Sequence, residues 1–206
     1  MFEISISKEQ LAILPVETYN GKIVLIDNYN SFEKAILELN KHSIVGIDTE
    51  SRPVFKKGQP SYVALVQIAT SDACYLIRLN KIGGIPHDLI KFFENANIMK
   101  VGLSLRDDIM RLHQMVNFEP RGFLDLQTFV KQYHIRDNGL QRIYAIVFGK
   151  HISKSQKLTN WAQPTLTEMQ QKYAAIDAWA CITVYNHLIT GQFNPDTSPY
   201  KISLDE

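Results

Sequence analysis

The chain has few cysteines, no long apolar run and almost no net charge, and each of these features excludes a class of protein. Its two cysteines, Cys74 and Cys181, lie far apart and form no C-x-x-C pair, which argues against a structural zinc site or a disulfide framework. No apolar run approaches the roughly 18 residues of a membrane span. Lys and Arg number 22 against 21 Asp and Glu, so overall basicity does not indicate a polyanionic partner. Such a partner would have to bind a local basic patch.

No repeat, low-complexity tract or linker divides the 206 residues, of which 45% are apolar, so we expect a single domain with a substantial core. The first residues, MFEISISKEQ, lack the basic and apolar regions of a signal peptide, and we expect a soluble, cytoplasmic protein. Residues 1–20 are predicted to be an irregular lead-in, residues 21–191 the domain and residues 192–206 a loose tail.

Along the chain, the spacing of apolar residues changes repeatedly between the alternation typical of strands and the spacing typical of helices. Strands are predicted over residues 23–26, 44–47, 62–69, 74–79 and 98–103, with another ending near residue 125, and residues 62–79 are predicted to form a hairpin. Helices are predicted over residues 31–39, 85–95, 106–116, 126–132 and 140–148, and from a capping box at Thr167 and Gln170 to about residue 188. This order predicts an α/β domain with a mixed sheet flanked by helices.

Asp48 and Glu50 form a D-x-E pair at the end of a predicted strand, where alternation points both side chains to one face. Carboxylates gathered in one site repel each other by about 4 kcal/mol per pair at contact distance and an effective dielectric of about 20. A fold that gathers several therefore needs cations. Taken alone the pair is a weak signal, because two solvated loop acids give the same pattern.

Asp177 lies in YAAIDAWA on the predicted last helix, among small and apolar residues that indicate a packed face. Tyr173 precedes it by one helical turn, so the phenol and the carboxylate point into the same space. A core tyrosine beside an exposed acid would give the same spacing.

Two further acids, Asp107 and Asp108, follow a buried strand in KVGLSLRDDIMRL. If their helix packs through Ile109 and Leu112, Asp108 falls nearer the buried edge. Asp107 is then explained as a first-turn acid that complements the helix dipole.

Taken in order, D-x-E, K-x-G-x(5)-D-x(3)-L and Y-x(3)-D resemble the DEDD superfamily of 3′-5′ exonucleases in its tyrosine subclass, the group of ribonuclease D and the Werner-syndrome helicase exonuclease domain. The similarity runs over residues 44–188 and includes VALVQIA and KLTNWAQPTLTEMQQKYAAIDAWA. The other subclass places His five residues before the last Asp, where this chain has Lys172. The resemblance implies a ribonuclease-H-like fold with a mixed, mostly five-stranded sheet.

The resemblance also implies a role for each motif residue. Asp48 would bridge two divalent cations, Glu50 and Asp177 would complete one site, and Asp108 would serve the other, partly through water. Tyr173 would orient the water that attacks the phosphodiester, and the products would be nucleoside 5′-monophosphates. The candidate site offers carboxylates and no Cys or His ligand, so Mg²⁺ or Mn²⁺ is favoured over Zn²⁺.

A nucleic acid with a free 3′ end needs cationic and stacking contacts that do not depend on sequence. Two basic clusters flank the motifs and are predicted to bind its phosphates: Arg52, Lys56 and Lys57 after the first motif, and Lys150, His151, Lys154 and Lys157 before the last. Solvated surface charge is the alternative for each of them. Met110 and Leu65 are candidates for base contacts, with core packing as the alternative.

Three other side chains near the motifs have simpler explanations. Trp161 and Trp179 are predicted to pack in the core, although Trp161 could also wedge against bases. Asp125 is either an acid that lies behind the metal site or the N-cap of the helix that follows it.

Two other classes of protein are alternatives to an exonuclease. A catalytically silent nucleic-acid-binding module on the same fold would not need to tolerate carboxylate repulsion. A Rossmann-type nucleotide-binding enzyme would carry a G-x-G-x-x-G turn after its first strand, which this sequence lacks. The chain leaves no room for a helicase segment, so we expect it to act alone or with a separate helicase or other processing partner. DNA and RNA are both candidate substrates, and the oligomeric state is open.

Overall fold

A six-stranded mixed sheet forms the centre of the computed structural model, which describes residues 1–52 and 61–204. Its strand order is β3-β6-β5-β4-β7-β8, and β5 runs antiparallel to both of its neighbours whereas the other pairs are parallel. The strands are β3 (Lys22–Ile26), β4 (Ile44–Ser51), β5 (Val63–Ala69), β6 (Ala73–Arg78), β7 (Met99–Gly102) and β8 (Phe123–Asp125). The predicted hairpin is confirmed as β5 and β6.

The sheet has one strand more than the expected five. The additional strand is β8, whose three residues pair with β7 at the edge of the sheet and confirm the strand predicted to end near residue 125. Only the end of this strand, at Asp125, was visible in the sequence, because three residues are too few for alternation to stand out.

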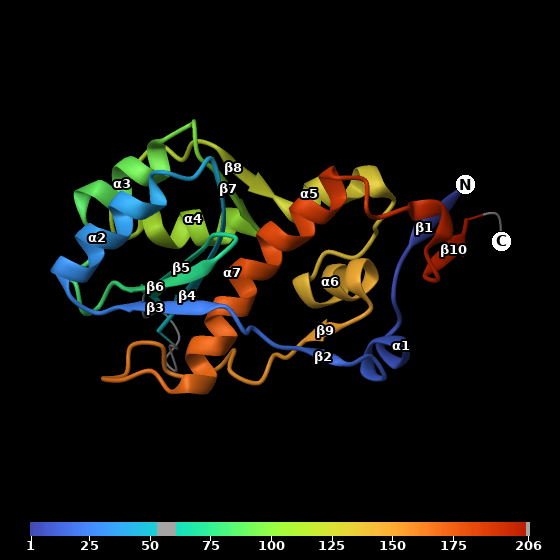
Figure 1. The fold of residues 1–206 in the computed structure, drawn as a ribbon, viewed down its shortest axis with the longest axis horizontal. Coiled ribbons are helices and arrows are strands. Elements are labelled where there is room, and N and C mark those ends of the chain that lie inside the picture. The colour runs from blue at the N-terminus through green and yellow to red at the C-terminus, as the bar shows by residue number, and fades with distance from the viewer. Residues whose placement is uncertain (53–60, 205–206) are drawn as a thin grey trace.

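Helices cover both faces of the sheet (Figure 1). One face packs against α2 (Tyr29–Leu39), α3 (His87–Glu94) and α4 (Leu105–His113), and the other against α6 (Leu140–Phe148) and α7 (Glu168–Ile189). The predicted helix over residues 126–132 is divided into α5 (Leu126–Phe129) and a 3-10 turn over Val130–Tyr133. The layers are therefore helix, mixed sheet and helix, as predicted.

The apolar spacing of α2 explains how it packs. Phe32, Ala35, Ile36 and Leu39 recur on one helical face, and all four are buried. Asn28 begins the helix, since its side-chain oxygen accepts a hydrogen bond from the backbone N–H of Ser31.

The longest helix, α7, crosses the sheet diagonally in Figure 1 and contacts β4, β5 and β6. Its predicted capping box is confirmed, because the Thr167 side chain accepts from the Gln170 backbone and the Gln170 side chain accepts from the Thr167 backbone. Ala174, Ala175 and Ala178 are fully buried, and their small side chains bring the helix axis close to the sheet.

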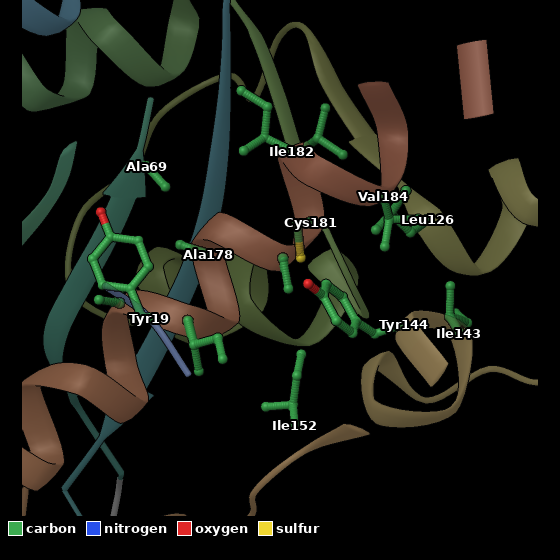
Figure 2. Packing of buried hydrophobic residues seen from close by; sticks show 14 of the residues in the cluster. Tyr19, Ala69, Leu126, Ile143, Tyr144, Ile152, Ala178, Cys181, Ile182 and Val184 are labelled. Atoms are coloured by element: carbon green, nitrogen blue, oxygen red, sulfur yellow. The ribbon is translucent and has the colours of Figure 1, made fainter. Parts of the chain in front are cut away.

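A hydrophobic cluster fills the space between α7, α6 and the sheet. Figure 2 shows Cys181 of α7 beside Tyr144 of α6, and Ala178, Ile143 and Ile152 belong to the same cluster. This packing sets the position of α7 against the sheet, and part of α7 contacts β4.

The two ends of the chain lie side by side, against expectation (Figure 1). Strand β1 (Phe2–Ile4) pairs antiparallel with β10 (Lys201–Ser203), and Ile4 and Ile6 are fully buried. Helix α1 (Lys8–Ala12) and strand β2 (Val16–Glu17) follow, and β2 pairs with β9 (His151–Ile152). A further 3-10 turn covers Pro195–Thr197. The predicted irregular lead-in and loose tail are therefore wrong, because each terminus supplies the pairing partner that makes the other a strand.

Crossing a bilayer requires a helix that is both long and apolar. None of the helices in the described part of the chain combines these two properties.

Candidate active site

The central strand β4 carries the first two acids of the site. Asp48 and Glu50 alternate with Thr49 and so share the face of the sheet that meets α7. Carboxylate oxygens of Asp48, Glu50 and Asp177 all lie within 4.8 Å of one another. The prediction that the D-x-E pair and Asp177 meet is confirmed.

A glycine allows α7 to reach β4 at this point. Gly46 lies on the same face as Asp48, and a β carbon placed there would overlap the carbonyl of Ala178, the residue after Asp177. The close approach of strand and helix therefore brings the Asp177 carboxylate to that of Asp48.

The turn before α4 positions Asp108, the acid of the second motif. Ser104 precedes α4 in the left-handed conformation, with φ of 58°, and its side chain does not cap the helix. The Asp125 carboxylate accepts hydrogen bonds from the N–H groups of Ser104 at 3.2 Å and Leu105 at 3.0 Å. It also accepts from the Gln127 N–H as the N-cap of α5, so the predicted capping role is confirmed and extends to α4.

Asp108 is buried and Asp107 is exposed, as the apolar spacing of α4 predicted. The Thr49 hydroxyl donates a hydrogen bond of 2.5 Å to Asp108 Oδ1. Asp108 lines the same cavity as Asp48, Glu50 and Asp177, although it lies outside the tight cluster of those three carboxylates.

Tyr173 lines the cavity one helical turn before Asp177 and is partly buried. Its hydroxyl forms a hydrogen bond with the Asp177 carboxylate. Its ring lies 5.9 Å from the ring of Trp161, which is buried as predicted. Tyr173 therefore lines the cavity while its ring packs against Trp161.

Burial and neighbouring charges strongly raise the pKa values of the acids in the site. Burial, followed by the charges of Asp177 and Asp108, raises the pKa of Glu50 to about 8. Burial raises the pKa of Asp177 to about 7, although the hydrogen bond with Tyr173 opposes the shift. Burial also raises the pKa of Asp108 to about 6 against the hydrogen bond from Thr49, and it raises the pKa of Asp48 well above its usual range. Ionising all four acids at neutral pH therefore requires compensating positive charge.

Positive side chains surround the acids in a cavity of about 440 Å³. Lys154 and Lys157, two of the predicted phosphate-binding residues, line it together with Arg111. Arg111 was not predicted, although its position three residues after Asp108 on α4 places both on one helical face.

Three other predicted substrate contacts, Arg52, Met110 and Leu65, do not line this cavity. Arg52 is exposed and lines a separate hollow, and Met110 is 55% exposed but does not line the acidic cavity. Leu65 has no exposed surface and packs under α7, so a base contact is wrong for this residue. The prediction for Lys56 and Lys57 falls outside the described residues.

Two other basic residues of the second predicted cluster already have partners. Lys150 forms an ion pair with Glu17 at 3.1 Å, and His151 Nδ1 lies 3.0 Å from the Leu14 carbonyl oxygen. Trp179 is partly buried and packs against the rings of Tyr19 and Tyr144, so its predicted packing role is confirmed.

The donor set fits a divalent cation with oxygen ligands. Three carboxylates converge within 4.8 Å, and burial opposes their ionisation, so a bound cation would relieve a repulsion that is built into the fold. Carboxylates are the protein ligands that Mg²⁺ and Mn²⁺ prefer.

The mixed sheet, the helices on both of its faces and the acidic cluster between its central strand and α7 are those of the ribonuclease-H-like class of α/β proteins. Within that class the chain belongs to the 3′-5′ exonuclease domain family, whose model, described as 3′-5′ exonuclease, matches residues 23–190.

Individual relatives agree with this assignment. The bifunctional 3′-5′ exonuclease/ATP-dependent helicase WRN of Mus musculus is 30% identical over 161 residues, which are 76% of this chain and 12% of that protein. Exonuclease 3′-5′ domain-containing protein 2 of Homo sapiens is 32% identical over 188 residues, covering 82% of this chain and 30% of that protein. This chain thus spans less than half the length of these relatives.

Solved structures show the same fold. The EXO domain of Nibbler from Aedes aegypti superposes with a TM-score of 0.77 at 25% identity, covering 88% of this chain and 96% of that domain. Escherichia coli RNase D superposes with a TM-score of 0.73 at 20% identity, covering 82% of this chain and 44% of that one.

Proposed function

We propose that this chain hydrolyses phosphodiester bonds from the 3′ end of a nucleic acid and releases nucleoside 5′-monophosphates one at a time. The observation that carries the proposal is the convergence of Asp48, Glu50 and Asp177 within 4.8 Å, in one cavity with Asp108 and Tyr173. A module that only binds nucleic acid gains nothing from this repulsive cluster.

The acids divide between two cation sites in this proposal. Asp48, Glu50 and Asp177 would hold one Mg²⁺ or Mn²⁺ ion, and Asp48 with Asp108 would hold the second. Such ions neutralise charge on the phosphate and lower the pKa of a bound water. The hydrogen bond from the Thr49 hydroxyl would hold the Asp108 carboxylate in position to bind the second ion.

We propose that this chain belongs to the tyrosine subclass, and we assign to Tyr173 the task of orienting the attacking water. Burial, followed by the charge of Asp177, raises the pKa of the Tyr173 hydroxyl far above neutrality, so the phenol keeps its proton. A neutral phenol holds water by hydrogen bonding and does not act as a free base.

Lys154, Lys157 and Arg111 would contact the phosphates of the substrate strand. The three cations line the cavity and belong to two different segments, so they can meet a strand from two sides. Charges of this kind bind the backbone of any sequence.

The relatives suggest both substrate class and partner. The RNase D of Trypanosoma brucei has been solved in complex with RNA U12, so RNA is the first substrate that we propose, with DNA as the second. The mouse relative joins an exonuclease to a helicase in one protein. We therefore propose that this chain works with a separate helicase or other processing partner that supplies free 3′ ends.

The decisive experiment offers DNA and RNA oligonucleotides, labelled at the 3′ or the 5′ end, in single-stranded and duplex form with Mg²⁺ or Mn²⁺. A 5′-labelled strand should shorten in single-nucleotide steps, whereas a 3′ label should be released at once as a mononucleotide. Asp48→Ala and Asp177→Ala should abolish both. Asp72→Ala, which changes an exposed acid in the β5–β6 turn, is the matched control and should retain activity. A parent chain that leaves every substrate intact with both metals would refute the proposal.

A further inference from the structure

Gln67 on β5 is a buried amide whose polar atoms are unsatisfied. The side chain has no exposed surface, and neither its oxygen nor its nitrogen has a hydrogen-bond partner among the described residues. Burying an amide without hydrogen bonds costs free energy, and nearly all buried polar groups in folded proteins have a partner. The presence of glutamine at this position therefore requires an explanation other than packing.

The sheet register places Gln67 beside the acidic cluster. Gln67 is the direct cross-strand partner of Asp48, and directly opposed residues of an antiparallel pair project from the same face. The next pairs on that face are Glu50 with Leu65 and Gly46 with Ala69. The Gln67 side chain thus lies on the α7 side of the sheet, next to the Asp48 carboxylate.

Apart from Asp48, the neighbours of Gln67 on this face are apolar. Leu65 and Ala69 flank it along β5, and Leu76 is its partner on β6. An apolar side chain would fill this space without leaving two amide atoms unsatisfied. Gln67 does not line the cavity that holds the acids, so it lies behind the cluster, away from the space open to substrate.

We propose that the Gln67 amide is the positioning group for the Asp48 carboxylate, to which its Nε2–H group donates when the cluster binds cations. This role rests on the proposed function. Groups that hydrogen-bond to a metal ligand from behind fix its orientation and raise its affinity for the ion, and removing them lowers metal affinity or activity by about 10–100-fold. The glutamine is thereby explained as part of the metal site rather than of the core.

Two near-isosteric variants, Gln67→Met and Gln67→Leu, test the assignment in the whole chain. The first measurement is the affinity for Mn²⁺, by titration calorimetry without nucleic acid. It should fall by about 10–100-fold in both variants. The second is the thermal midpoint in EDTA, which should stay equal or rise, because an apolar side chain removes the unsatisfied amide.

Leu65→Met is the matched control. Leu65 lies on the same strand and the same face, opposite Glu50, and has no polar atom to lose. The Leu65→Met variant tests whether any change in packing under α7 weakens the metal site. Its Mn²⁺ affinity should stay within about threefold of that of the parent.

Folded Gln67 variants that bind Mn²⁺ as tightly as the parent would overturn the proposal. So would a failure of both variants to fold, since it would show that the amide is needed for the fold itself. The calorimetry uses no substrate, so a parent chain that binds Mn²⁺ but cleaves nothing would refute the exonuclease function and still decide the role of Gln67. A parent that binds no Mn²⁺ would overturn the positioning role directly.

Discussion

The Thr49 hydroxyl donates a 2.5 Å hydrogen bond to Asp108 Oδ1 and so joins the central strand to α4 inside the site. Thr49→Val keeps the shape of the side chain but removes the donor, leaving a buried carboxylate with one partner fewer. We expect the metal concentration that gives half-maximal activity to rise by about 10–100-fold. Thr49→Ser retains the hydroxyl and should behave like the parent. Equal metal dependence in Thr49→Val and Thr49→Ser would show that the hydrogen bond has no role in the site.

The raised pKa values predict an unusual pH dependence of stability in the absence of metal. Glu50, Asp177 and Asp108 have a folded pKa of about 8, 7 and 6, whereas unfolded carboxylates titrate near pH 4. The folded chain therefore binds more protons than the unfolded chain between about pH 4 and pH 8, and the free energy of unfolding falls as pH rises through that window.

Urea denaturation in EDTA at several pH values, repeated with saturating Mg²⁺, would measure this effect. Mg²⁺ should restore the stability that is missing at the higher pH values, because the ions compensate the ionised cluster. Asp177→Asn removes one titrating group and should flatten the dependence. An EDTA series in which stability rises across the window would mean that burial and the neighbouring charges do not raise these pKa values.

Gly46 predicts a second link between stability and activity. A β carbon at this position would lie 2.0 Å from the Ala178 carbonyl oxygen, which belongs to helical backbone and cannot move alone. Gly46→Ala should push α7 away from β4, at a cost of about 1–3 kcal/mol or somewhat more. It should also separate Asp177 from Asp48, so Mn²⁺ affinity should fall even in the fraction that remains folded. Denaturation curves and a Mn²⁺ titration measure the two effects, and an unchanged affinity would show that the close approach at Gly46 positions no acid.

The sequence predicted those parts of the site that depend on periodicity within one element. Alternation placed Asp48 and Glu50 on one face of β4, and helical spacing chose Asp108 over Asp107. The same rule could have found Arg111, because a residue one turn after Asp108 shares its helical face. VALVQIA also lacks alternation altogether, which indicates a strand buried on both faces and should have excluded Leu65 as a base contact.

Contacts between distant segments could not be read from the sequence. Strands β1 and β10 have three residues each and exist because they pair with each other across nearly the whole chain. The hydrogen bonds that the Asp125 carboxylate accepts from Ser104 and Leu105 form because β7 and β8 are neighbours in the sheet. The sequence alone does not give this strand order. Pairing partners of this kind are set by tertiary packing, which local propensity does not encode.

Lys154 and Lys157 predict the salt dependence of substrate binding. Replacing both with Gln should weaken binding uniformly across sequences and reduce the slope of log affinity against log salt by about 0.7 for each phosphate of a single strand that the protein no longer neutralises. Lys41→Gln with Lys91→Gln is the matched control, because these exposed lysines lie away from the cavity. Fluorescence anisotropy with a single-stranded oligonucleotide measures the binding, and the Asp48→Ala change is added to each protein so that the oligonucleotide is not cleaved. Equal slopes in the two double variants would assign Lys154 and Lys157 to solvated surface.

Tyr173 offers the sharpest test of mechanism, because its ring and its hydroxyl have separate roles. The ring packs against Trp161 and the hydroxyl bonds to Asp177 inside the cavity. Tyr173→Phe should keep the packing and the affinities for metal and substrate but lower turnover by about 10²–10⁴, the usual effect of a positioned proton-handling group. Tyr173→Ala should in addition cost about 3–5 kcal/mol of stability, as a truncated core aromatic does.

Single-turnover rates at saturating metal, measured with thermal melts of both variants, separate these roles. If Tyr173 only packs, Tyr173→Phe retains nearly full turnover and only Tyr173→Ala shows a defect, which lies in its melting temperature. If the hydroxyl orients water, Tyr173→Phe melts like the parent yet cleaves slowly. Because the hydroxyl also bonds to Asp177, a Mn²⁺ titration of Tyr173→Phe is the necessary control. Unchanged Mn²⁺ affinity with slow cleavage would assign the loss of turnover to the water and not to a displaced carboxylate.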